Sequence, residues 1–264
     1  MTKRYLLSRI CGSMLIEKEG ITLQPKKKTT ALSQRKLEEQ QQKQRMKRLI
    51  WFSSVAILII LIIVVFSIKP NSSTPAEPVA PNTFPYDTLP VLGNKEAKVK
   101  VVEFGDYQCP ACRDFTQQVK PQIVKDYVDK GLVSFYFMNF SFIGDESNLA
   151  ALAAQAVYHQ SNDAFWKYYE ALYREQGAEN SGRITEAYLV DLAKKENLQI
   201  DYNKLQQDIE HKQYQDEVDK HNAKTKELNI QYSPTIYVND TQYTGHYLDY
   251  GSLKKDIEKA LKGE

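Results

Sequence analysis

Two cysteines separated by two residues stand between a strand-like and a helix-like segment, and this placement constrains the fold more than any other feature. Cys109 and Cys112 follow the apolar run at 99–104 and precede a helix-like stretch that begins near Arg113. Such a strand–turn–helix step places both sulfurs at the first turn of a helix, where free N–H groups and the helix dipole favour a thiolate. The outer sulfur can then exchange disulfides, and the second sulfur closes the ring.

A metal site is the main alternative for a pair of cysteines with this spacing. A structural zinc site needs four ligands, which commonly come from two such pairs. The only other cysteine is Cys11, and the four histidines show no ligand spacing: His159, His211, His221 and His246. The sequence therefore favours a redox pair over a metal ligand set, and we expect no metal and no cofactor other than the Cys109–Cys112 disulfide.

A long uncharged segment, Leu49–Ile68, predicts a transmembrane helix. It is long enough to cross a hydrocarbon core of about 30 Å. The alternative is a cleaved signal peptide, but the apolar region of a signal peptide spans roughly 7–15 residues and a small-residue cleavage site follows it. No such site follows closely here. We therefore expect a signal anchor that stays in the protein.

Charges around this segment predict its orientation. Lysines and arginines crowd the preceding stretch at 26–48, whereas only Lys69 follows closely. The positive-inside rule then places the N-terminus in the cytoplasm and the rest of the chain outside, where disulfides persist. Cys11 would lie on the reducing side as a bystander thiol. The overall charge of +2 offers no reason to expect a nucleic-acid partner.

Composition divides the chain into four parts. Residues 1–48 form a basic cytoplasmic tail that is too polar to fold alone, and residues 49–68 form the membrane anchor. Residues 69–88 are rich in proline and serine, as in an extended linker. Residues 89–264 remain for one folded domain, which is long enough for a single core.

Within this domain, periodicity predicts a strand–helix–strand unit. Residues 98–104 and 132–140 read as two parallel strands, and the helix between them has an apolar face. Pro121 interrupts that helix, so we expect a kink near 117–120. The chemistry then lies at the carboxyl end of the first strand, as is usual for α/β sheets.

A helical stretch at about 146–228 follows and is too long for a simple crossover. Asp201 is a plausible N-cap within it, and its aromatic stripe near Trp166 is more typical of core than of a ligand site. Strands then return at 235–238 and 242–244, joined by a hairpin, before a final helix capped by Asp249. This order predicts an α/β protein: a thioredoxin fold with an inserted helical subdomain, preceded by one transmembrane helix.

The motif and its surroundings resemble those of a known family. The segments PVLGN at 90–94, VEFGDYQCPAC at 102–112 and the later Ser233-Pro234-Thr235 step are similar to DsbA-like thiol-disulfide oxidoreductases. The similarity is closest to the membrane-anchored BdbD type of Gram-positive bacteria, and it spans about 89–261. It implies a bacterial cell membrane location with the catalytic domain outside.

The resemblance assigns a role to each residue of the motif. Cys109 would be the attacking, substrate-exposed sulfur, Cys112 the buried resolving one, and Pro110 the residue that stiffens the turn. Ala111 departs from the best-known member, which has a histidine there. An imidazolium would lower the thiolate pKa, so Ala111 implies a less extreme oxidant.

Three further residues take roles from the resemblance. Pro234 would be cis and lie against the disulfide, although an X–Pro bond taken alone is expected to be trans. Ser233 would offer backbone hydrogen bonds to an extended substrate. Glu103 would be a buried acid that moves a proton to or from Cys112, and the alternative is a carboxylate that faces solvent at the strand end.

These implications predict an enzyme that introduces disulfides into exported polypeptides. A membrane quinone reductase resembling DsbB would reoxidise it, and anchoring would raise its effective concentration near that partner. A reductase or isomerase of the same fold is one alternative. A membrane-tethered copper or other metal chaperone is another, although no added His or Met lies near the motif. A helical docking module without enzymatic work is disfavoured because both thiols are present.

Overall fold

A computed structural model describes residues 39, 42–55, 78–80 and 83–263. The chain divides into two compact units, Met1–Pro70 and Asn71–Glu264. In the first unit residues 42–55 are helical. The basic tail up to residue 38, the later part of the predicted membrane anchor at 56–68 and most of the predicted linker lie outside the described residues. In the described part of the chain, no helix is long and apolar enough to cross a membrane.

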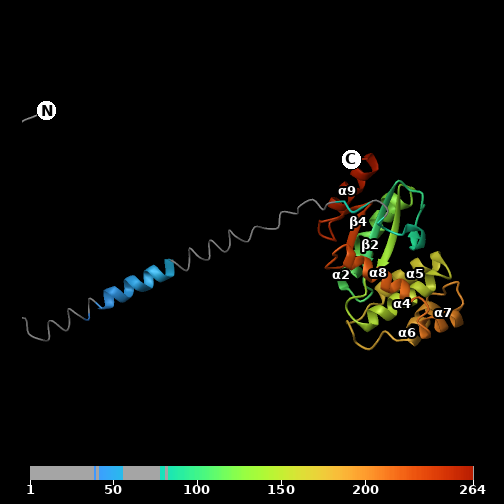
Figure 1. Ribbon diagram of the computed structural model, residues 1–264, viewed down its shortest axis with the longest axis horizontal. Helices are drawn as coiled ribbons and strands as arrows, with labels where there is room; N and C mark the ends of the chain where they lie inside the picture. The colour runs from blue at the N-terminus through green and yellow to red at the C-terminus, as the bar shows by residue number, and fades with distance from the viewer. Residues whose placement is uncertain (1–38, 40–41, 56–77, 81–82, 264) are drawn as a thin grey trace, which may run out of the picture. The chain divides into compact units, whose positions relative to one another are not determined.

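The second unit is built on one five-stranded sheet with the strand order β1-β3-β2-β4-β5. Figure 1 shows β2 and β4 of this sheet, with α4, α6 and α7 beyond one end of it. Its strands are β1 (Val91–Leu92), β2 (Val99–Gly105), β3 (Val133–Asn139), β4 (Thr235–Val238) and β5 (Thr241–Gln242). The central β2 pairs in parallel with β3 and antiparallel with β4. Both predicted parallel strands are confirmed. They are near-continuous apolar runs because both faces of the sheet are covered.

The edges of the sheet differ from the sequence prediction. The short β1 was not predicted, since two residues are too few to show a period-two pattern. The last strand was predicted at 242–244 but lies at Thr241–Gln242, which leaves Asn239 and Asp240 as the hairpin turn. Asn239 has a φ of 51°, which asparagine tolerates and which two-residue hairpin turns require. The turn chemistry therefore set the register, and the sequence pattern did not reveal it.

The helix after the cysteine motif is broken, as predicted from Pro121. It runs as α2 (Pro110–Gln118), α3 (Lys120–Ile123) and a π-helical turn, η2 (Val124–Val128), with the break at Val119. Proline has no N–H to continue the helical hydrogen bonds, and its ring clashes with the preceding turn. The break allows α2 to begin at the carboxyl end of β2 in a different direction from α3 and η2.

The predicted helical insert is confirmed between β3 and β4. It contains α4 (Asp145–Tyr158), α5 (Asn162–Arg174), α6 (Glu186–Lys195), α7 (Tyr202–Glu210) and α8 (Gln215–Glu227). Asp201 caps α7 by accepting hydrogen bonds from two backbone N–H groups. Asp249 caps the final helix, α9 (Tyr250–Lys262), in the same way, by accepting from Ser252 N–H. Both caps satisfy donors that a helix start leaves free.

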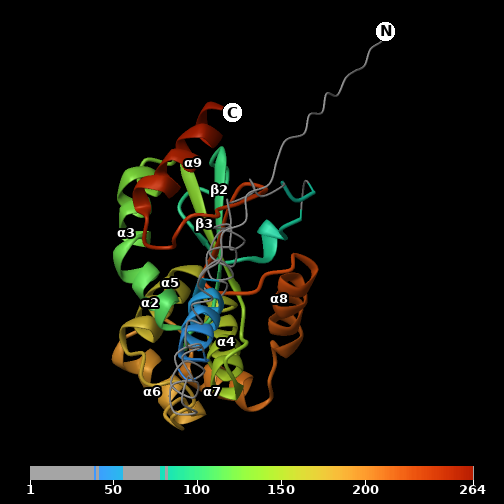
Figure 2. The ribbon, with the colours of Figure 1, turned by 90° about the vertical axis from the view of Figure 1, so that its left-hand side faces the viewer.

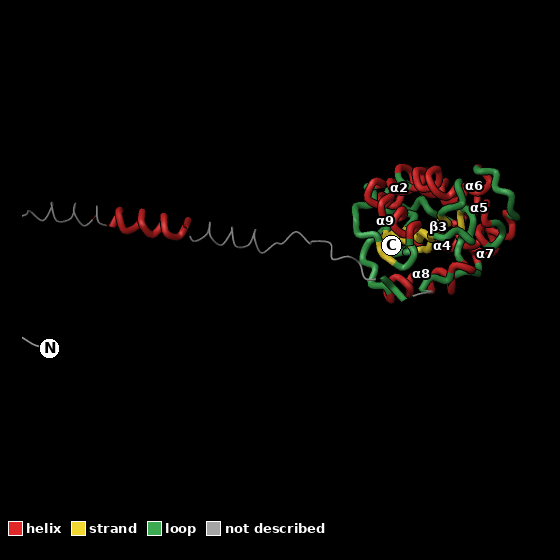
Figure 3. The backbone as a smooth tube through the Cα atoms, turned by 90° about the horizontal axis from the view of Figure 1, so that it is seen from above, coloured by secondary structure: helices red, strands yellow, loops and turns green. Residues whose placement is uncertain are grey.

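Helices and a preceding segment cover the two faces of the sheet. Figure 2 shows α2, α3 and α9 on one side of β2 and β3 and α8 on the other, and from above the strands lie between helices (Figure 3). On the first face Phe135 of β3 packs on Phe115 of α2. On the second, Phe84 packs against Phe104 and Tyr237, with ring centroids 6.1 and 5.1 Å away. This is the predicted thioredoxin fold.

A buried histidine joins the insert to the sheet. His221 of α8 is 5% exposed, and its Nδ1 lies 3.3 Å from the backbone nitrogen of Asn139, which donates to it. The Asn139 side-chain amide also lies 3.1 Å from Nδ1. Burial lowers the pKa of His221 from 6.5 to about 4. The neutral imidazole therefore ties α8 to the end of β3.

This tie predicts an acid-sensitive contribution to stability. Between pH 6.5 and 4 the unfolded chain binds a proton at His221 that the folded protein does not, so the free energy of unfolding falls as the pH falls. His221→Leu removes this linkage and also leaves the Asn139 backbone N–H without its His221 acceptor. In urea unfolding, the variant should be less stable than the wild type at pH 7, and the gap should narrow by about 2 kcal/mol at pH 5. A gap that does not depend on pH would contradict this assignment.

Candidate active site

Cys109 and Cys112 lie at the start of α2, where the sequence predicts them. Cys109 is the N-cap residue in an extended conformation, and Pro110 is the first helical residue. Proline suits this position because its missing N–H would be unpaired anyway. Both cysteines are free thiols. Cys109 is 8% exposed and Cys112 is 0% exposed, so only the outer cysteine has any contact with solvent.

The environment of Cys109 favours its thiolate. The pKa of its thiol is lowered from 9.0 to about 6, first by the hydrogen bond from the Cys112 thiol, against an opposing effect of burial. The backbone N–H groups of Cys112 and Ala111 lower the pKa further. The free N–H groups of the helix start therefore act as the motif predicted. A large fraction of Cys109 is ionised at neutral pH.

Cys112 has the opposite tendency. Burial raises the pKa of its thiol well above 9.0, and its hydrogen bond to Cys109 and the charges of Cys109 and Glu103 raise it further. Because Cys112 has no exposure to solvent, its proton must come from or go to a group inside the protein. The two sulfurs thus differ in charge at the same pH although only two residues separate them.

A cis Ser233–Pro234 peptide bond lies beside the outer sulfur, as the resemblance implied. The Cys109 sulfur lies 3.5 Å from the Ser233 carbonyl oxygen, to which only its protonated form can donate. The Ser233 hydroxyl is buried and has no hydrogen-bond partner among the described residues. A pocket of about 290 Å³ begins here, and its lining is mainly aromatic and apolar: Tyr232, Ser233, Pro234, Ile236, Tyr243, Gly245, His246 and Tyr247.

Glu103 is buried in the sheet and does not face solvent. It lies in the middle of β2, opposite Phe137 of β3 and Ile236 of β4, and is 0% exposed. Its Oε2 accepts a hydrogen bond of 2.6 Å from the Tyr169 hydroxyl. Burial raises the pKa of Glu103 from 4.5 to about 8, which Tyr169 and the charge of Lys120 partly oppose. At neutral pH most of this carboxyl is protonated and can donate a proton.

The turn before Cys109 is held by the helical insert. The Asp106 carboxylate accepts hydrogen bonds from the Ser147 hydroxyl at 2.6 Å and from three backbone N–H groups. The Gln108 side chain donates to Ser147 at 2.8 Å and accepts from the Asn180 N–H at 2.7 Å. Both side chains are almost fully buried. They fix the turn to α4 and to the loop after α5.

Gln176 adds a second restraint on the same turn. Its amide nitrogen donates to the carbonyl oxygens of Tyr107 at 2.9 Å and of Cys109 at 3.0 Å. The sequence pattern revealed neither Gln176 nor Asp106, because their contacts join residues 36–69 positions apart. A polar pair at 106 and 108 next to the motif was the only local signal.

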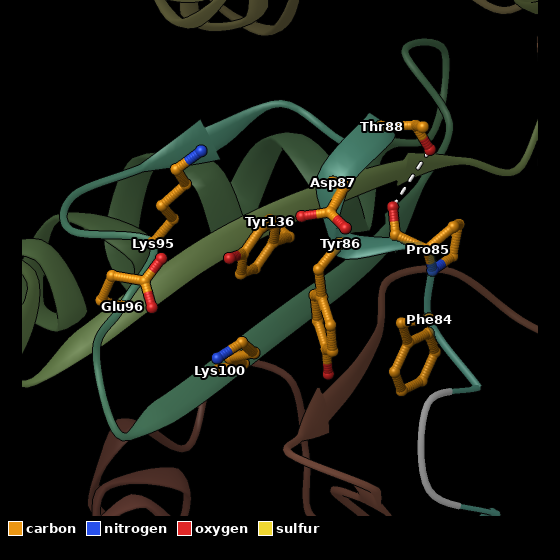
Figure 4. Close-up of a pocket in the computed structure, with 9 residues that line it drawn as sticks. All are labelled: Phe84, Pro85, Tyr86, Asp87, Thr88, Lys95, Glu96, Lys100 and Tyr136. Carbon is orange, nitrogen blue, oxygen red and sulfur yellow. Dashed lines mark hydrogen bonds between the residues drawn. The ribbon is translucent and has the colours of Figure 1, made fainter.

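A larger pocket of about 560 Å³ lies elsewhere, along the segment before β1 (Figure 4). The Lys100 Nζ lies 5.4 Å from the centroid of the Tyr86 ring there. None of its nine lining residues is a cysteine or one of the predicted site residues. Cys109 instead contacts Ser233, which lines the smaller pocket.

Comparison with known proteins adds independent observations. A family model described as thioredoxin matches residues 86–259. The chain is 40% identical to the probable disulfide bond formation protein D of Bacillus anthracis, over 68% of this chain and 81% of that protein. It is 41% identical to disulfide bond formation protein D of Bacillus subtilis, over 66% of this chain and 78% of that protein.

Solved structures agree with these sequence matches. The crystal structure of oxidised BdbD from Bacillus subtilis superposes with a TM-score of 0.66 and 39% identity, covering 72% of this chain and all of that one. DsbA from Chlamydia trachomatis superposes with a TM-score of 0.61 at 23% identity, which shows a shared fold.

The buried carboxyl of Glu103 predicts a stabilising substitution. Between pH 4.5 and 8 the folded protein keeps a proton on Glu103 that the unfolded chain releases, so its contribution to stability is lost as the pH rises through this window. Glu103→Gln stays neutral and can still accept from Tyr169. In urea unfolding of the reduced protein, the variant should match the wild type near pH 4.5 and exceed it by a few kcal/mol at pH 8.

A matched control separates burial from charge alone. Glu179 lies exposed in the loop after α5, so Glu179→Gln should follow the wild type at each pH. A Glu103→Gln protein that is destabilised at pH 8 would show that the carboxylate is favoured in the fold, and the assignment of a raised pKa would be wrong.

Proposed function

Because this chain belongs to the thioredoxin family that includes the Bacillus disulfide bond formation D proteins, we infer that it is a protein-disulfide oxidoreductase that introduces disulfide bonds into other polypeptides. Family membership rests on the family match over residues 86–259 and on 40% identity to a protein of which the match covers 81%. The inference about the reaction follows from the site itself.

One observation carries the proposal: the two sulfurs of one motif have opposite acid–base behaviour. Cys109 has a thiol pKa of about 6, and burial raises the pKa of Cys112 above 9.0. A sulfur with a low pKa is a good leaving group, so a disulfide that contains it is easily reduced. Stabilising the Cys109 thiolate therefore favours the dithiol form of the enzyme and makes its disulfide oxidising.

The reaction begins when a client thiolate attacks Cys109 in the disulfide form. The Cys109–Cys112 bond breaks as a bond forms between the client sulfur and Cys109. Cys112 leaves as a thiolate in a fully buried position, where it needs a proton. Glu103 is protonated at neutral pH and lies close enough for its charge to raise the Cys112 pKa, so we assign it as the donor.

A second client thiolate then completes the exchange. It attacks the client sulfur of the mixed disulfide, and Cys109 leaves as the stabilised thiolate. The client loses two electrons and gains a disulfide, while the enzyme gains two electrons and is left with Cys109 and Cys112 reduced. No further cofactor is needed. The Ser233 backbone and the pocket beside Pro234 are assigned to the extended client chain next to the sulfur.

The position of the domain in the cell follows from the sequence. We assign 49–68 as a single membrane anchor, with a cytoplasmic N-terminus and the catalytic domain outside the bacterial membrane. There the clients are newly exported polypeptides with cysteines. The reduced enzyme needs an electron acceptor, which we assign to a membrane quinone reductase resembling DsbB. Anchoring both proteins in one membrane raises their effective concentration.

Redox equilibrium with glutathione tests the direction of exchange. Ala111 provides no positive charge, so the potential should be oxidising but below the roughly −120 mV of DsbA, which has a histidine there. Titration of the full chain against reduced and oxidised glutathione, followed by thiol alkylation, gives the potential. A value near −270 mV would match thioredoxin and would identify a reductase instead.

The proposed roles of the two cysteines predict different trapping behaviour. Cys112→Ser leaves Cys109 free to form mixed disulfides with clients and removes the thiol that would release them. Cells that express this variant should accumulate such adducts on non-reducing gels, and Cys109→Ser, the matched control, should accumulate few. In the reduced wild type, alkylation should modify Cys109 well before Cys112 because only Cys109 reaches solvent. Equal trapping by both variants would exclude these roles.

The lowered pKa of Cys109 predicts that reduction stabilises the fold. Its thiolate contribution is absent below the folded pKa of about 6, grows above it and is complete above the unfolded value of 9.0. The ordinary gain from a crosslink is small for such a short loop. In calorimetry at pH 7 the reduced protein should melt several degrees above the oxidised one, and the difference should grow toward pH 9. A more stable oxidised form throughout would favour a reductase.

A further inference from the structure

A buried lysine lies beside the site and has no role in the exchange just described. Lys120 is the first residue of α3 and is 2% exposed. Its Nζ lies 2.8 Å from Oε1 of Glu170, whose side chain is 58% exposed. An ammonium group is costly to bury unless it is paired. The Glu170 carboxylate is largely exposed to water, so its pairing with Lys120 offsets only part of the cost of burying the ammonium group.

The remaining surroundings of Lys120 are aromatic. Its Nζ lies 4.9 Å from the ring centroid of Tyr169 and 5.3 Å from that of Trp166. Both distances are within the range of a cation–π interaction. A cation above the face of a phenol withdraws electron density from the ring, so the hydroxyl becomes a better hydrogen-bond donor. The charge of Lys120 therefore acts on the Tyr169 hydroxyl.

The same hydroxyl contacts the buried acid. Tyr169 donates to Oε2 of Glu103 at 2.6 Å, and its oxygen lies 2.8 Å from the hydroxyl of Thr116, which can donate to it. Lys120, Tyr169 and Glu103 thus form a continuous series from α3 through α5 to β2. A carboxylate formed at Glu103 therefore accepts a hydrogen bond from the polarised Tyr169 hydroxyl, and the positive charge of Lys120 lies over the Tyr169 ring.

We propose that Lys120 is a positioning residue that acts through Tyr169 and sets the pH range in which Glu103 exchanges its proton with Cys112. This inference deepens the proposed function and rests on it. The step balances as a proton transfer: protonated Glu103 and the Cys112 thiolate give the Glu103 carboxylate and the Cys112 thiol. Lys120 stabilises the carboxylate that this transfer creates.

The other titratable groups around Glu103 carry no positive charge. Tyr107 follows β2, Cys109 and Cys112 lie on α2, and Tyr169 and Tyr173 lie on α5. Lys120 is the one cation among the described groups that act on Glu103. Burial alone raises the pKa of a carboxyl, and a nearby like charge on Cys109 raises it further. The Tyr169 hydrogen bond and, after it, the charge of Lys120 oppose this rise and help Glu103 to release its proton near neutral pH.

A carboxyl titration tests this directly on the full chain in detergent. The Glu103 carbon resonance in ¹³C-labelled protein is identified by its loss in Glu103→Gln, and its midpoint is followed with pH. Lys120→Met keeps the apolar stem and removes the charge, so the midpoint should rise by about one unit or more. Lys120→Arg keeps a cation and should restore most of the wild-type value. A Lys120→Met midpoint equal to the wild type would overturn the proposal.

Glu170→Gln is the matched control, and it decides the question even if Lys120→Met does not fold. It removes the exposed anion next to Nζ and leaves the cation free to act on Tyr169. The Glu103 midpoint should then fall, opposite in sign to the effect of Lys120→Met. General damage at the α3–α5 contact would shift the Glu103 midpoint in the same direction in both variants. That result, or a higher Glu103 midpoint in Glu170→Gln than in the wild type, would overturn the proposal.

Kinetics give a second readout. The rate of reduction of the disulfide form by glutathione, divided by the concentration of glutathione thiolate, should fall above the Glu103 midpoint because the proton donor is lost. Lys120→Met should move this fall to higher pH. The fall in rate should be absent from Glu103→Gln and equally from the double variant that combines it with Lys120→Met. A pH profile that differs between these two proteins would assign Lys120 a purely structural effect. The carboxyl titration needs no thiol exchange, so a wild type that fails to oxidise thiols would refute the proposed function separately.

Discussion

Cys109 and Cys112 shift each other's pKa in opposite directions, and because Cys112 is fully buried, its proton stays inside the protein. The rest of the site can be understood from this coupling. It makes Cys109 the anionic sulfur, with help from the first N–H groups of α2, and it keeps Cys112 neutral. An internal acid then becomes necessary, because water cannot reach the sulfur that must gain or lose the proton. Glu103, buried in β2, meets this need.

Such an arrangement depends on an accurately placed turn, and the sheet alone does not provide it. Asp106 and Gln108 bond to the insert from the turn, and Gln176 of the insert bonds back to the turn. In this fold the insert is therefore part of the catalytic support as well as a cover for the sheet. Hydrogen bonds from several elements restrict the turn more than any one of them would. The break at Val119 lets α2 take the orientation that this turn imposes.

Local signals in the sequence were enough to predict the motif, the central strands, the kink at Pro121 and the caps at Asp201 and Asp249. Each depends on neighbours within a few residues. The cis bond at Pro234 followed only from resemblance, since the residues alone favour trans. The register of β5 was wrong because a two-residue turn set it. Lys120 and Gln176 were missed because their partners lie 50 to 69 positions away, beyond any local pattern.

The aromatic stripe on α5 has a spectroscopic consequence. The chain contains two tryptophans, and Trp166 is the one in the folded domain; Trp51 belongs to the other compact unit. Its indole packs edge-on against Tyr169, with ring centroids 5.2 Å apart, and Lys120 Nζ lies 5.3 Å from its ring. Indole emission responds to nearby charges, so Trp166 is an intrinsic optical probe placed two contacts from Glu103. The protein can report the state of its own proton donor without any added label.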